Sequence, residues 1–193
     1  MDANGDTRHD QTMRSLGVLV LRFTVGGYLA VHGAQKLFGS FGGYGIEGTG
    51  GFFDNIGLKP GRHLAALAGM TEFGGGVLTA TGIAHPLGPA ATAGAMAVAT
   101  ATHLPKGPLA ATGGYELPLT NLAALVALAS MSPGPLRLGP RLSPKLTGAT
   151  LAATVVISGV LVRQVLMAQR APEPASATTE PATTEPATDS TSS

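Results

Sequence analysis

Six of the ionisable side chains that lie within or beside long apolar stretches of the sequence are candidate site residues, because each must be paired, hydrated or functional. They are Arg22, His32, Lys36, Glu72, His103 and Glu116. A charged group inside a bilayer span is costly unless it finds a partner or water, so each of these residues marks a candidate ligand-binding site. Carboxylates and imidazoles can exchange protons, while ammonium and guanidinium groups attract anions and electron-rich oxygens.

The first three of these residues are spaced to share one face of a helix. At 100° per residue, Lys36 lies about 40° and His32 about 80° from Arg22. The rise from Arg22 to Lys36 is about 21 Å at 1.5 Å per residue, which is most of the thickness of a bilayer core. The spacing therefore predicts a polar stripe along the first span.

The elements that position these side chains are predicted to be membrane helices. Only 12% of the 193 residues are charged and 44% are hydrophobic, and blocks of roughly 20 mainly apolar residues are typical of bilayer spans. The predicted spans cover about 15–38, 63–83, 90–103, 117–131 and 146–168. The expected fold is all-α, a polytopic membrane bundle of four helices plus a fifth transmembrane helix.

Composition divides the chain into four segments. These are a polar N-terminus (1–14), a four-helix membrane domain (15–138), a basic loop with the fifth span (139–170) and a Pro/Thr-rich tail (171–193). The tail cannot bury enough apolar surface to fold and is expected to be disordered. The connection over 39–62 is Gly-rich and aromatic, which favours an interfacial, partly buried loop.

Alternating spans bring most of the six residues to one membrane face. Those expected there are His32, Lys36, Glu72, His103 and Glu116, with Arg22 nearer the other end. Two interpretations stay open for this cluster. Its charges could simply pair to hold the bundle together, or they could line a pocket that handles a quinone head group, an anion or a proton.

Several other kinds of site are not predicted. His32 and His103 have no paired-ligand spacing that would indicate a metal or haem site, and His9, His63 and His85 are expected to be interfacial or solvated. The chain has no cysteine, so it offers no thiolate nucleophile and no thiolate-ligated cluster. Its net charge of +1 provides no electrostatic footprint for nucleic acid.

A set of short motifs follows in a fixed order along the first four predicted spans. The motifs are Arg22, His32-Gly33 with Lys36-Leu37, Glu72 with the glycines that follow it, His103, Gly113-Gly114-Tyr115-Glu116, and the Pro133-Gly134-Pro135 break. Their order and spacing resemble the DoxX family of small bacterial integral membrane proteins. The resemblance covers 15–138 and implies a bundle of four DoxX-like helices in the bacterial plasma membrane, to which this chain adds a fifth span.

The resemblance also implies a function. Members of the family resemble the small subunit of a thiosulfate:quinone oxidoreductase, and others are linked with membrane complexes that handle oxidative and thiol stress. This implies a subunit that supports membrane redox chemistry, with a quinone as the candidate cofactor and a redox partner protein or a second copy as the partner. On this interpretation Lys36 and Arg22 supply positive charge, and the catalytic candidates for proton exchange are Glu72, His32, His103 and Glu116.

Two other functions remain open, and so does the sidedness of the chain. The protein could be a noncatalytic scaffold or assembly factor in the membrane, or a small-solute transporter that acts as an oligomer. The short loop after the fourth span carries Arg137, Arg141 and Lys145. Basic loops stay on the cytoplasmic side, so these residues favour a cytoplasmic N-terminus.

Overall fold

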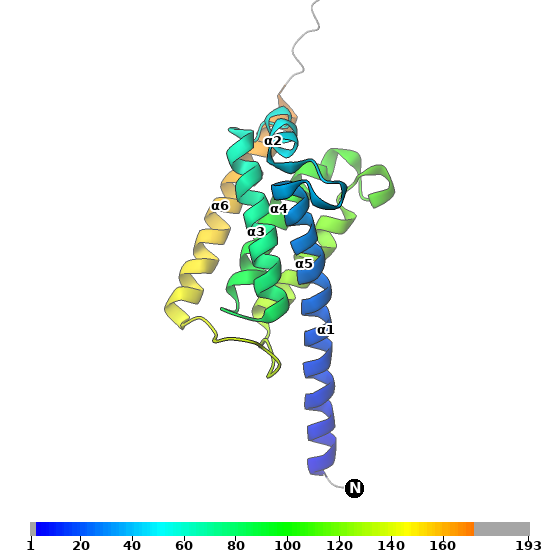
Figure 1. Cartoon of the computed structure of the whole chain (residues 1–193), viewed down its shortest axis with the longest axis vertical. Helices are drawn as coiled ribbons and strands as arrows, with labels where there is room; N and C mark the ends of the chain where they lie inside the picture. Colours follow the sequence, from blue (N-terminus) through cyan, green and yellow to red (C-terminus); the bar gives the residue numbers. More distant parts are fainter. Residues whose placement is uncertain (1–2, 172–193) are drawn as a thin grey trace, which may run out of the picture.

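The computed structural model describes residues 3–171, and this part of the chain is helical without a β-strand. Its helices are α1 (Ala3–Phe38), α2 (Gly45–Asn55), α3 (Gly61–Thr81), α4 (Leu87–His103), α5 (Glu116–Ser130) and α6 (Pro144–Arg170), with short 3-10 turns at Ser40–Gly42, Leu104–Lys106 and Ala110–Thr112. Helices α1, α3, α4 and α5 form a bundle, α2 covers one end, and α6 packs against α4 from outside (Figure 1). The predicted all-α fold is confirmed, and the tail over 172–193 lies outside the described residues.

The predicted spans agree with the helices to within three residues at every end but one. The exception is α1, which begins at Ala3 and extends well beyond the other helices at its N-terminal end (Figure 1). By length and composition, two of the described helices can cross a membrane, over Asp10–Phe38 and Pro144–Arg170, while α5 is a shorter apolar helix. The polar N-terminal segment is therefore a helical extension of the first span.

The connection between α1 and α3 was predicted to be a loop, and this was wrong for its central part. Residues 45–55 form α2, whose Thr49 and Gly50 are buried. A Cβ at Gly50 would lie 2.9 Å from Cα of Arg62 at the start of α3. The many glycines lower the intrinsic helix propensity of this segment, but they also allow it to approach α3 closely, and this tertiary contact stabilises the helix.

Glycines bring α1 and α3 into backbone contact. A Cβ at Gly26 would lie 2.5 Å from the carbonyl oxygen of Gly76, and a Cβ at Gly33 would lie 2.7 Å from that of Gly69. Each helix contributes two glycines seven residues apart, which places both on one face. Small residues permit such close approach of helices in lipid. We refer to these four glycines as the α1–α3 seam.

Helices α3 and α4 are in close contact at the end of the bundle away from α2. A Cβ at Gly88 would lie 2.6 Å from the amide nitrogen of Thr79, and a Cβ at Gly75 would lie 2.7 Å from Cγ2 of Thr92. Towards α2, residues on both helices line a cavity instead. The two helices are therefore held together at one end and separated at the other.

Arg22 links α1 to α3 and to the segment after α5, at the end of the bundle away from α2. Its side chain is 2% exposed and donates hydrogen bonds to the carbonyl oxygens of Thr79 (3.0 Å), Ala80 (2.8 Å), Pro133 (2.6 Å) and Leu136 (3.1 Å). The last turn of a helix leaves carbonyls without intrahelical partners. Arg22 satisfies two of them on α3 and links them to the segment after α5.

His85 is buried at the same end, and the prediction that it is interfacial or solvated was wrong. Only 4% of it is exposed, and its Nε2–H donates to the carbonyl oxygen of Met131 at 3.0 Å. The segment after α5 folds over it, since the backbone N–H of Leu142 donates to the carbonyl oxygen of His85 at 2.9 Å. His63 is exposed, as predicted, and the side chain of His9 lies outside those described.

The α1–α3 seam generates a first prediction, with a matched pair of adjacent glycines. Gly26→Ala places a methyl group against the backbone of α3, and overpacking of this kind destabilises by about 1–3 kcal/mol. Gly27→Ala places the same methyl group in open space, where the better helix propensity of alanine leaves stability unchanged or slightly raised. Thermal unfolding in detergent should show a lower midpoint than the wild type for Gly26→Ala but not for Gly27→Ala. Equal midpoints in the two variants would contradict the close backbone contact at the α1–α3 seam.

A second prediction concerns pH. Burial lowers the pKa of His85, and the positive charge of Arg141 lowers it further, although the hydrogen bond to Met131 opposes this shift. The folded state disfavours the charged ring, so protonation of His85 favours unfolding. The contribution of neutral His85 to folding stability is therefore complete above the unfolded pKa of about 6.5 and is lost as the pH falls below it. Unfolding midpoints measured from pH 8 to pH 5 should fall less steeply in His85→Asn than in the wild type. His63→Asn, an exposed control, should retain the wild-type slope, and equal slopes in all three proteins would contradict the prediction.

Candidate functional site

A cavity of about 1060 Å³ lies at the α2 end of the bundle. It reaches from the interior between α1, α3, α4 and α5 to the outer helix α6, and most of its lining is apolar. Four of the six residues that the sequence singled out line it, namely His32, Lys36, Glu72 and His103. Arg22 and Glu116 do not. Four of the candidate residues are thus brought together at the cavity, whereas Arg22, expected nearer the other end of the bundle, and Glu116 lie outside its lining.

The polar part is centred on an ion pair between α1 and α3. Lys36 Nζ lies 2.5 Å from Glu72 Oε2. Glu72 is 3% exposed, whereas 26% of the Lys36 side chain remains exposed. A carboxylate this buried must be paired, because an isolated charge would be strongly destabilised. An ammonium has three N–H donors and this contact uses one, so Lys36 retains donors that can meet a ligand oxygen.

The two imidazoles are oriented by hydrogen bonds at Nδ1. Nδ1–H of His103 donates to the carbonyl oxygen of Gly113 at 2.7 Å, and Nδ1–H of His32 donates to Oε1 of Gln35 at 3.0 Å. The amide of Gln35 is itself oriented, since Nε2–H donates to the carbonyl oxygen of Phe41 at 3.2 Å. In the neutral form each ring then has Nε2 as a proton acceptor.

Glu116 supports the site without lining the cavity. Its exposed carboxylate accepts a hydrogen bond from the backbone N–H of Ala110 at 2.9 Å. It also lies in the first turn of α5, where the helix dipole favours a negative charge. The loop that Glu116 holds carries Gly113, the partner of His103, so its effect on the cavity is to position that histidine. Arg22, as expected, lies at the other end of the bundle.

Several polar residues of the cavity were not identified from the sequence. In the bundle they include Gln35, Thr71, Thr102 and Asn121, and on α6 they are Thr150, Thr154 and Ser158. The α6 residues recur every four positions on the predicted fifth span, and this spacing is a signal of a common face. The bundle residues carry no comparable pattern, because neutral polar side chains are frequent in this sequence.

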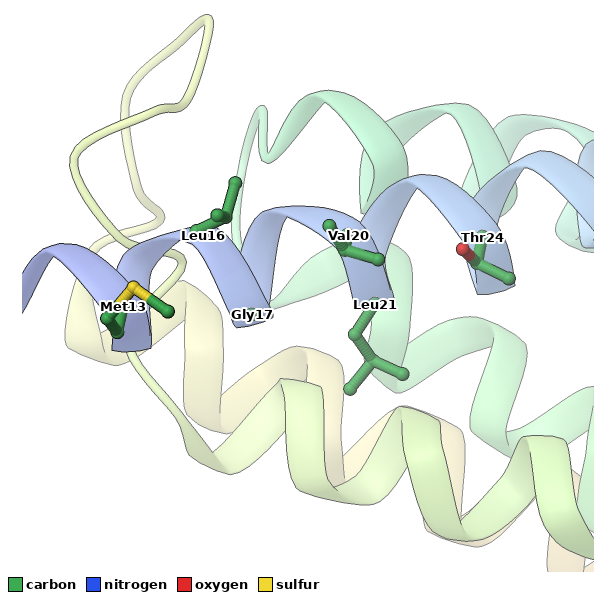
Figure 2. A pocket seen from close by; sticks show the side chains of 6 residues that line it. All are labelled: Met13, Leu16, Gly17, Val20, Leu21 and Thr24. Atoms are coloured by element: carbon green, nitrogen blue, oxygen red, sulfur yellow. The ribbon is translucent and has the colours of Figure 1, made fainter.

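A second hollow lies along α1 and differs from the cavity in its lining. Its lining residues all belong to that helix: Met13, Leu16, Gly17, Val20, Leu21 and Thr24. Figure 2 shows Leu21 pointing towards a neighbouring helix, in line with its packing against the bundle core. The hollow is shallow and has no titratable side chain. Across residues 3–171, no three His, Asp or Glu side chains gather in a way that could hold a metal ion.

Comparison with known proteins identifies a domain. Residues 17–105 match the family model of DoxX, a segment that runs from α1 to the turn after α4 and contains Arg22, His32, Lys36, Glu72 and His103. No curated protein and no solved structure matches the chain. The match and the long apolar helices α1 and α6 agree on a membrane location. Residues 17–105 are therefore a DoxX domain, and the chain that carries it is a membrane protein.

Proposed function

We propose that the protein is a multi-pass subunit of the bacterial plasma membrane that binds a quinone in its cavity and supports the redox chemistry of a partner protein. The observation that carries this proposal is the position of the Lys36–Glu72 ion pair. It lies in the wall of a largely apolar cavity whose lining also includes His32 and His103. Ligand sites are commonly apolar with a few convergent polar groups, and this cavity has that composition.

The polar groups suit a quinone head group. A quinone presents two carbonyl oxygens, and Lys36 has N–H donors free to bind one of them. Reduction of a quinone to a quinol takes up two electrons, which a partner oxidoreductase supplies in this proposal, and two protons. His32 and His103 can accept protons at Nε2 and deliver them to the reduced oxygens. Glu72 balances the charge of Lys36 throughout this exchange.

The lengths and surfaces of the helices support a membrane-spanning arrangement. At 1.5 Å per residue the 36 residues of α1 extend about 54 Å, longer than a hydrocarbon core of about 30 Å, so its polar N-terminal turns project beyond the lipid. Helix α6 exposes large aliphatic side chains, among them Val155, Val156 and Val160, which suit contact with lipid. We propose that α1, α3, α4, α5 and α6 all cross.

The basic loop supports an orientation for this arrangement. Arg137, Arg141 and Lys145 are exposed. The first two belong to the loop between α5 and α6 and Lys145 lies in the first turn of α6, at the end of the bundle nearer the N-terminus (Figure 1). Basic loops favour the cytoplasmic side, so the N-terminus is cytoplasmic in this proposal. The cavity then lies towards the outer face of the membrane, where α2 covers the bundle.

A scaffold role is the second candidate, because the same ion pair also joins α1 to α3. Buried ion pairs can hold elements in register without binding anything. The two functions differ in what a neutral replacement of the pair would do. A ligand site would lose its ligand and keep its fold, whereas a structural link would lose stability.

The third prediction separates these two functions with a double variant. Lys36→Gln with Glu72→Gln replaces the ion pair by two amides that can still bond across α1 and α3, but it removes the charged donor. Loss of a charged hydrogen bond costs about 1.5–3 kcal/mol, so affinity for decylubiquinone, measured by calorimetric titration in detergent, should fall roughly 10- to 100-fold. The unfolding midpoint should stay near that of the wild type.

The control is the exposed ion pair between Glu47 and Arg62, whose atoms lie 2.6 Å apart. Glu47→Gln with Arg62→Gln should change neither binding nor stability, because exposed pairs contribute little. Unchanged quinone binding in the Lys36/Glu72 variant would exclude a ligand role for the pair. A large drop in its unfolding midpoint with no change in affinity per folded molecule would favour the scaffold.

A further inference from the structure

Helix α6 lies outside the segment that matches DoxX, yet it forms one wall of the cavity. The match ends at residue 105, and α6 begins at Pro144. Thr150, Thr154, Ser158 and Leu161 of α6 line the same cavity as Lys36 and Glu72. The cavity of this chain therefore extends beyond the helices of the matched segment.

The contacts of α6 leave a groove on one side of it. It packs against α4, where a Cβ at Gly94 would lie 2.8 Å from Cγ2 of Thr154, and Nε2–H of Gln169 donates to the carbonyl oxygen of Ala101 at 3.0 Å. Within the described part of the chain, α3 is not among the helices against which α6 packs closely. Residues of α3 and α6 therefore flank a groove whose floor is α4.

The groove is continuous with the polar part of the cavity. On α4 the lining residues turn from Ala91 and Gly94, on the side of α6, to Ala99 and His103, on the side of the bundle interior. Both α3 and α4 contribute lining residues to this one cavity, among them Glu72 on α3 and His103 on α4, so the cavity is continuous past these two helices. A single ligand can thus reach from the Lys36–Glu72 pair into the groove.

The lining of the groove suits an apolar ligand tail better than a polar head group. One of its three α6 hydroxyl groups is engaged on its own helix, since Ser158 Oγ–H donates to the carbonyl oxygen of Thr154 at 2.6 Å. Besides these three hydroxyls, the groups on its α6 side are aliphatic. Ala153 and Ile157 are exposed at its edge, on a helix whose membrane segment is only 6% buried, so the groove opens sideways towards the lipid.

We infer that the groove between α3 and α6 holds the apolar tail of a single-tailed ligand whose oxygen-bearing head group meets the Lys36–Glu72 pair. The tail leaves the protein between these two helices and enters the lipid there. This inference rests on the proposed function and adds to it the amphipathic class of the ligand and its route of access. Both follow from a helix that the matched domain does not contain.

The fourth prediction uses two neighbouring alanines of α6. Ala153 and Ala152 are both exposed, but only Ala153 lines the groove. Ala153→Trp should fill the groove and weaken binding of decylubiquinone at least about tenfold, because several tail methylenes then remain unburied. It should leave binding of the tail-less 2,3-dimethoxy-5-methylbenzoquinone within about twofold of the wild type. Ala152→Trp should change neither affinity.

Single-cysteine variants give a second measurement that avoids the bulk of tryptophan. The natural chain has no cysteine, so Ala153→Cys and Ala152→Cys each carry one thiol. Decylubiquinone should slow modification of the thiol at 153 by a membrane-permeable maleimide, and the tail-less quinone should not. The thiol at 152 should react at the same rate with either ligand or with none.

The outcomes distinguish this inference from the proposed function. If both quinones bind the wild type but neither Ala153→Trp nor the thiol at 153 responds to the tail, the groove assignment is wrong and the head-group site stands. If neither quinone binds the wild type, the proposed function fails and the inference fails with it. Unfolding midpoints of both tryptophan variants establish that any loss of binding occurs in folded protein.

Discussion

Backbone contact between α1 and α3 is the constraint on which the rest of the structure depends. Gly26 and Gly33 bring α1 so close to Gly76 and Gly69 that no side chain fits between the helices. Lipid gives no hydrophobic drive for helices to associate, so such packing is a main source of affinity between them. The same approach places Lys36 of α1 opposite a carboxylate of α3, where their charges meet at 2.5 Å. The buried ion pair is thus a consequence of the seam.

The cavity results from unequal packing elsewhere in the bundle. Helices α3 and α4 are fastened around Gly75 and Gly88, and Arg22 secures that end through four carbonyl groups. Towards the other end both helices line the cavity, and α2 contributes Thr49, Phe52 and Phe53 to the same lining. A bundle that was tight along its whole length would leave no room for a ligand, and one loose at both ends would expose its polar groups. One closed end and one open end satisfy both requirements.

Much of the fold could be predicted because membrane helices can be recognised from the length and composition of their apolar segments. All five predicted spans appear as helices. Alternation of the spans predicted five of the six candidate residues at one end of the bundle, and four of those five line the cavity. The failures share a cause. Helix α2 and the burial of His85 depend on segments distant in sequence that pack against them. Neither apolar periodicity nor helix propensity reports such contacts, so the loops of the bundle were beyond single-sequence reasoning.

The polar stripe on α1 illustrates how one sequence pattern can serve two purposes. Arg22 and Lys36 lie on the same face of one helix and both contact α3, but their partners differ. The guanidinium of Arg22 is 2% exposed and is surrounded by four carbonyl oxygens that accept its hydrogen bonds, so it has little left to offer a ligand. Lys36 has one carboxylate partner and a partly exposed ammonium in a cavity wall. The hydrogen bonds of Arg22 are satisfied within the fold, so this residue is structural, whereas Lys36 retains donors that can contact a ligand.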